Sequence, residues 1–143
     1  MKKYLLFAAI FTFVTASVHA QDLKSKDVPQ NVKNALSKKY PEAKGVSWEK
    51  EKGNYEANWG GKSGEDNSVQ FTPAGEFIEV VKAISVSALP KATTQYVKEH
   101  FNNAKITEAG RVTDAKGQTF YEAEVKGKDV IFDEKGNFIK VED

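Results

Sequence analysis

The sequence predicts an α+β protein built as a tandem duplication of one α-β4 unit. Three observations support this fold class. The chain matches itself when it is shifted by 61 residues, as from Val28 to Leu89. Each copy opens with apolar residues at helical spacing. Each copy then continues with short segments that alternate apolar and polar residues and are separated by turns containing glycine. We place the two repeats at residues 28–84 and 89–143.

The first 20 residues have the features of a secretory signal peptide. Lys2 and Lys3 precede an apolar stretch, and Val18-His19-Ala20 has the form of a cleavage site. We therefore predict cleavage after Ala20 and a periplasmic or secreted single domain over residues 21–143. The apolar stretch is short for a membrane span, so we expect no stable membrane insertion after cleavage.

The composition of the chain argues against several classes of function. Two of the 21 basic residues lie in the predicted signal peptide, which leaves 19 basic against 20 acidic residues and a net charge of −1. A nucleic-acid partner is not expected, because nucleic-acid binders usually carry a basic stripe. The chain has no cysteine, which excludes disulfides and thiol chemistry. His100 is the only histidine after Ala20, so a structural zinc site is excluded as well.

A helix is predicted at the start of each repeat. The apolar stripe of the first copy runs from Val28 to Tyr40, and that of the second runs from Leu89 to Phe101. Asp27 with Gln30 has the spacing of a capping box, and Ser87 is the expected cap of the second helix.

Four strands are predicted after each helix, with hairpin turns between them. In the first copy they cover residues 46–48, 55–59, 69–71 and 77–84. In the second copy they cover residues 106–113, 119–125, 130–132 and 138–141.

The order of these motifs resembles a known family. Val-Pro, a helix, Tyr-Pro-Glu-Ala, Val-x-Trp-Glu, Gly-x-Tyr-Glu-Ala and Phe-x-x-x-Gly-x-Phe-Ile occur in sequence between residues 28 and 78, and a second round follows from Leu89. This pattern is similar to that of the PepSY-like, β-lactamase-inhibitor-protein-like (BLIP-like) family of exported bacterial proteins. The resemblance implies one curved antiparallel sheet with both helices on one face. It supplies no catalytic motif.

Three features superficially resemble sites for a metal, a phosphate or catalysis, and each has a simpler structural interpretation. Asp133 to Asn137 has oxygen ligands but lacks the alternating spacing of a calcium loop, and Gly75 matches Gly136 in the first copy, so a tight turn is expected. Residues 60–64 are rich in glycine but open no helix, which favours a hairpin connection over a phosphate loop. His100 is interpreted as a helix-end histidine. We expect no cofactor, no metal and no enzymatic activity.

The candidate binding site is the sheet face away from the helices. Alternation along the strands directs Glu56 and Asn58 to this face from the first copy, and Glu122 and Glu124 from the second. A solvated face is the simplest interpretation of such charges, and an acidic binding face is the functional one. Phe120 is the candidate aromatic anchor for a partner.

Two further aromatic residues, Phe77 and Phe138, are expected on the open face or near its edge. The sequence thus favours a non-catalytic binding module for an exported protein, acting as an inhibitor or regulator. The alternatives are a carrier of a small ligand or cation and, less favoured, a hydrolase.

Overall fold

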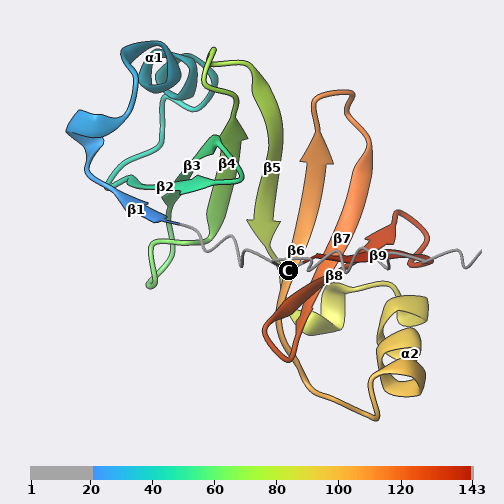
Figure 1. The fold of residues 1–143 in the computed structure, drawn as a ribbon. Coiled ribbons are helices and arrows are strands. Elements are labelled where there is room, and N and C mark those ends of the chain that lie inside the picture. The colour runs from blue at the N-terminus through green and yellow to red at the C-terminus, as the bar shows by residue number, and fades with distance from the viewer. Residues whose placement is uncertain (1–20, 143) are drawn as a thin grey trace, which may run out of the picture.

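The computed structural model describes residues 21–142, so the predicted signal peptide lies outside the described residues. Nine strands form one open antiparallel sheet in which every strand pairs with its neighbours in the chain (Figure 1). The first half contains β1 (Gln21–Leu23), α1 (Gln30–Lys39), β2 (Ser47–Glu51), β3 (Asn54–Trp59), β4 (Asn67–Phe71) and β5 (Phe77–Ala83). The second half contains α2 (Lys91–His100), β6 (Ile106–Asp114), β7 (Thr119–Val125), β8 (Lys128–Asp133) and β9 (Phe138–Glu142). The α+β class and the duplicated plan are confirmed, and β1 is an addition that the sequence pattern does not predict.

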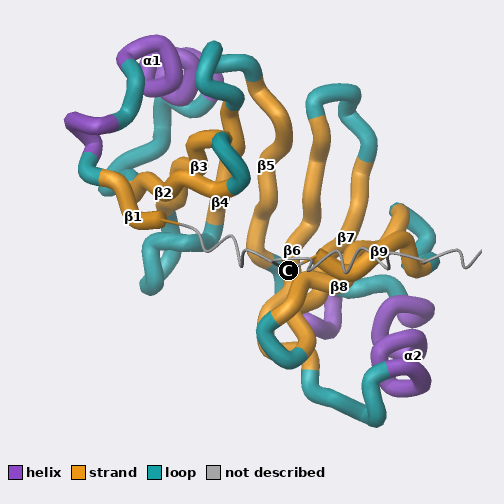
Figure 2. The backbone as a smooth tube through the Cα atoms, viewed as in Figure 1, coloured by secondary structure: helices purple, strands orange, loops and turns teal. Residues whose placement is uncertain are grey.

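The two repeats join through β5 and β6. These strands pair antiparallel, with Val81 opposite Val112, and so continue the sheet from one copy into the next. Figure 2 shows strands in both halves of the molecule, with α1 and α2 at separate ends. That both helices cover the same face of the sheet stays a prediction.

The start of each helix differs from the prediction. A 3-10 turn precedes each helix, at Ser25–Asp27 and at Val86–Ala88, and the N-cap residues are Pro29 and Pro90. Neither helix has a side-chain capping hydrogen bond. The predicted caps Asp27 and Ser87 are therefore wrong, because both residues are used in the 3-10 turns instead.

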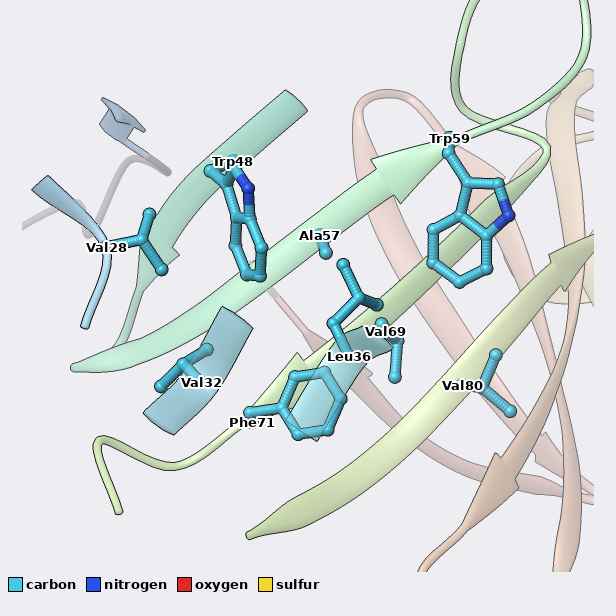
Figure 3. Packing of buried hydrophobic residues seen from close by; sticks show 9 residues of the cluster. All are labelled: Val28, Val32, Leu36, Trp48, Ala57, Trp59, Val69, Phe71 and Val80. Carbon is cyan, nitrogen blue, oxygen red and sulfur yellow. The ribbon is translucent and has the colours of Figure 1, made fainter. Parts of the chain in front are cut away.

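Each helix packs on the strands of its own repeat. Val32 and Leu36 of α1 lie over Ala57, Val69 and Phe71 (Figure 3). The corresponding core of the second repeat contains, among others, Val97, Ala123, Val130 and Phe132. Burial of these side chains is the main stabilising contribution that such a small chain without disulfides has.

Candidate functional site: an acidic hollow on the sheet

A broad hollow of about 860 Å³ lies on the sheet, lined by residues of both repeats. Its lining includes eleven carboxylate residues and one basic residue, Lys52. The carboxylates are Glu49, Glu51, Glu56, Glu65, Asp66, Glu79, Glu108, Glu122, Glu124, Asp129 and Glu142. We call this surface the acidic hollow. The whole chain is nearly neutral, with a formal net charge of +1. The excess of negative side chains in the hollow is therefore a local feature of this surface.

Glu56 of β3 is held by a neighbouring amide. It lies opposite Glu49 on β2 and opposite Gln70 on β4. Nε2 of Gln70 donates a hydrogen bond of 2.9 Å to Oε2 of Glu56, and a longer one of 3.4 Å to Glu51. Burial, and then the charge of Glu56, raise the pKa of Glu49.

Glu122 of β7 stands in a less polar environment. Its cross-strand neighbours are Gly110 on β6 and Ile131 on β8. Burial raises the pKa of Glu122 to about 8, with further contributions from Asp129 and Glu79. The charge of Glu56 also raises it, so the matched glutamates of the two repeats interact electrostatically across the acidic hollow.

Other carboxylates of the hollow are perturbed in the same direction. Burial raises the pKa of Glu79, and Glu142 and Glu56 raise it further, whereas Lys140 lowers it. Burial and Glu124 raise the pKa of Asp129. The hollow therefore gathers carboxyl groups that are partly desolvated, and among them Glu51 pairs with Lys52, and Glu142 pairs with Lys52 and Lys140.

The remaining two polar candidates, Asn58 and Glu124, also line the acidic hollow. Glu124 accepts a short hydrogen bond from the hydroxyl of Thr107. Asn58 is only 5% exposed. The amide of Asn58 makes no side-chain hydrogen bond to any residue in the described range 21–142.

Phe120 lies in a smaller pocket beside the hollow. This pocket has a volume of about 330 Å³. Four apolar residues line it, Val112, Phe120, Ile131 and Ile139, and we call it the apolar pocket after them. The charged residues at its boundary are Glu79, Asp114, Glu122, Lys140 and Glu142. Glu79, Glu122 and Glu142 line both cavities, so an apolar and an acidic surface meet at these residues.

Phe77 and Phe138 do not lie on the open face. Phe77 packs against the core of the first repeat, with its ring centroid 6.2 Å from that of Phe71. Phe138 stacks on Tyr96 of α2 at 4.7 Å. The register shifts at β4–β5 and at β8–β9 are the cause, because a bulge reverses the faces to which the following residues point.

Sequence reasoning missed several members of the hollow. Glu79 lines the hollow and alternates with buried Val80, although the bulge in β5 places Phe77, two residues before it, on the core side. Glu49 was accessible to sequence analysis, because it alternates with buried Trp48. Asp129 lies outside the predicted strand, which begins at Val130. In the structure β8 begins at Lys128.

The tight-turn interpretation of Asp133 to Asn137 agrees with the structure. Asp133 accepts three hydrogen bonds of 2.9 Å from Lys135 and Asn137, and those from Asn137 lower its pKa. Gly75 and Gly136 have φ values of +82° and +86°, as the tight turns require. Within residues 21–142, no group of three or more acidic, histidine or cysteine residues is arranged to hold a metal ion.

His100 and the glycine-rich segment 60–64 lie in the places that the sequence predicts. His100 stacks on Tyr96 at 4.1 Å at the end of α2 and does not line the hollow. The glycine-rich segment 60–64 connects β3 to β4 and opens no helix. Neither helix of the described chain has the length and apolar character needed to cross a bilayer.

Comparison with known proteins identifies the family. The family model described as "Putative beta-lactamase-inhibitor-like, PepSY-like" matches residues 13–60 and 59–140. No curated protein matches the chain.

Solved structures share the fold. A Bacteroides eggerthii DSM 20697 protein, described among "putative periplasmic proteins", has a TM-score of 0.66 at 24% identity and covers 80% of this chain and 88% of its own. A DUF2874 family protein from Bacteroides ovatus ATCC 8483 has a TM-score of 0.63 at 23% identity, with coverage of 79% and 85%. A BLIP-like protein from Bacteroides fragilis NCTC 9343 has a TM-score of 0.59 at 25% identity, with coverage of 80% and 85%. Because the family model spans most of the sequence, the chain belongs to the PepSY-like, β-lactamase-inhibitor-like family.

Proposed function

We propose that this protein is a non-catalytic periplasmic binding module whose acidic hollow receives a basic surface of another exported protein, which it inhibits or regulates. One observation carries the proposal: eleven carboxylate residues and a single lysine line one hollow of the sheet. An antiparallel sheet can leave one face free for such contact.

The electrostatics of the hollow support a cationic partner. Burial and mutual repulsion raise the pKa values of Glu49, Glu79, Glu122 and Asp129, so ionisation of these groups is less favourable here than in a fully solvated side chain. Lysine and arginine side chains of a partner would offset this repulsion. A field of one sign also accelerates the encounter with an oppositely charged surface.

A small polycation is the second candidate ligand. The volume of about 860 Å³ falls in the range of roughly 300–1,000 Å³ that small-ligand sites occupy. Such sites are mostly apolar, however, whereas this lining is dominated by carboxylates. The observations therefore favour a basic protein surface.

Capture from periplasmic extract with the mature protein as bait tests the proposal. The bait that reverses the formal charge of the two matched glutamates is the double variant Glu56→Lys, Glu122→Lys. The matched control is Glu42→Lys, Glu134→Lys, which makes the same formal change of charge at two exposed positions outside the hollow. Association rates of each captured protein are then measured by biolayer interferometry at low and high salt.

The hollow variant should lose the partner, and the control should retain it. The association rate with wild type should fall as salt is added, because salt screens attraction between opposite charges. Equal association rates for the hollow variant and the wild type at low salt would exclude the acidic hollow as the binding surface. Spermine serves as the probe for a small polycation. Binding of spermine to the wild-type protein, with no protein captured from the extract, would favour the small polycation.

A further inference from the structure

The two matched glutamates differ in one neighbour. Glu56 has Gln70 beside it, and the 61-residue repeat places Ile131 at the position of Gln70 in the second copy. Gln70 donates a hydrogen bond to Glu56. Ile131 has no donor to offer, and no hydrogen bond to the Glu122 carboxylate arises from residues 21–142. The second repeat therefore leaves its glutamate without an internal partner.

The backbone provides room for this carboxylate. A Cβ atom added to Gly110 would overlap Oε1 of Glu122 and would come within 2.7 Å of Cγ1 of Val81. The Glu122 side chain thus lies over the glycine, at the boundary between the acidic hollow and the apolar pocket. A ligand at this boundary meets a carboxylate and an apolar surface together.

Asn58 gives a second, independent indication of a ligand. Its side chain lines the hollow, is 95% buried as judged by its 5% exposure, and has no side-chain hydrogen-bond partner in the described part of the chain. Among the described residues the only fully buried side-chain polar atom without a partner is Oγ1 of Thr93, so the amide of Asn58 opens onto the hollow. Its donors and its acceptor are therefore available to a ligand with hydrogen-bonding groups.

On the basis of the proposed function, we propose that Glu122 binds one lysine or arginine side chain of the partner. An apolar side chain next to that basic residue in the partner enters the apolar pocket. The partner motif is therefore a basic residue next to an aromatic or large aliphatic residue. The charge at Glu122 selects the cation, and the pocket of Val112, Phe120, Ile131 and Ile139 selects its neighbour. Apolar burial supplies affinity that exposed charge alone does not.

Binding should be coupled to loss of a proton from Glu122. The carboxyl groups that raise its pKa to about 8 are Asp129, Glu79, Glu56 and Glu142, from β8, β5, β3 and β9. The one cation of β9 beside it, Lys140, forms an ion pair with Glu142. A bound cation favours the ionised form and lowers the pKa, so the complex holds fewer protons than the free protein below about pH 8. Affinity should consequently rise with pH up to that value.

Defined peptides test this inference on the mature protein. The probe is acetyl-Lys-Phe-Lys-Phe-amide, and its comparisons are the Lys-Ser-Lys-Ser and Glu-Phe-Glu-Phe peptides. Binding is followed by NMR from the aromatic signals of Phe120, at several pH values. The variants are Glu122→Gln, which keeps the shape, and Ile131→Gln, which gives Glu122 the donor that Glu56 has. Glu134→Gln is the exposed control.

The Lys-Phe peptide should bind at least about tenfold more tightly than either comparison peptide. Its affinity should rise by up to about tenfold per pH unit between pH 6 and pH 8, and this rise should disappear in Glu122→Gln. Glu122→Gln and Ile131→Gln should each weaken binding, and Glu134→Gln should leave it unchanged.

Other outcomes separate this inference from the proposed function. Equal binding of the Lys-Phe and Lys-Ser peptides, with no effect of Glu122→Gln, would overturn the inference, even if the charge-reversed bait still loses its partner. If the peptides bind equally and the charge-reversed bait also keeps its partner, both this inference and the proposed function are overturned. Shifts of Phe120 that follow protein concentration without peptide would mean that a second copy occupies the pocket, which also overturns the inference.

Discussion

The carboxylate of Glu122 lies over the backbone of Gly110 on the neighbouring strand, in space that any other residue at position 110 would fill. The pairing explains why a glycine occurs inside a long strand, where it normally weakens the sheet. It also holds the carboxylate in a partly buried place, which is why its pKa is raised.

Gly110→Ala should destabilise the fold by about 1–3 kcal/mol, because the added methyl group overlaps Glu122 and approaches Val81. Urea denaturation measures the change. In a Glu122→Ala background the cost should be smaller, since one of the two overlaps is gone. Additive effects of the two substitutions would contradict the contact.

Stability should decrease between pH 5 and pH 8. The folded chain keeps a proton on Glu122 up to about pH 8, whereas the unfolded chain loses it near the ordinary glutamate pKa, so the folded state binds more protons in this window. The free energy of unfolding should fall by at most about 1.4 kcal/mol per pH unit from this group. Glu122→Gln should reduce the slope, and Glu79 and Asp129 should account for part of the remainder. A slope unchanged by Glu122→Gln would show that Glu122 titrates normally.

Thr93→Val should stabilise the protein. The hydroxyl of Thr93 is buried and has no hydrogen-bond partner within the described residues, and the repeat places Val32 at the matched position. Removing an unsatisfied buried hydroxyl should raise the free energy of unfolding by about 1 kcal/mol. The reverse change, Val32→Thr, should lower it. A melting temperature that falls in Thr93→Val would mean that the hydroxyl has a partner, such as a bound water.

Both helices should contribute to one cooperative fold. Leu36→Ala and Val97→Ala should each lower the free energy of unfolding by about 1–4 kcal/mol, because both side chains are buried under their helices. Ser37→Ala is the exposed control and should change little. An unchanged denaturation midpoint for either core variant would remove that residue from the core.

Export should remove the first 20 residues. N-terminal sequencing of the exported protein should begin at Gln21, because Val18-His19-Ala20 follows the apolar stretch. A membrane-bound product that still starts at Met1 would contradict the cleavage.

The sequence by itself determined the α+β class, the duplication and most strand positions. These depend on short-range patterns, such as Ala57 and Val69 on the core side of their strands, which one chain displays directly. It also placed Glu56 and Glu122 in matched positions, since alternation within a strand needs no knowledge of other strands.

Only the tertiary structure decided how these positions combine. The bulges that turn Phe77 and Phe138 toward the helices depend on pairing between strands. The same pairing placed Gln70 beside Glu56, and Gly110 with Ile131 beside Glu122. Two glutamates with identical sequence neighbours thus acquired different surroundings, because a side chain's desolvation and hydrogen bonds come from across the sheet rather than along the strand.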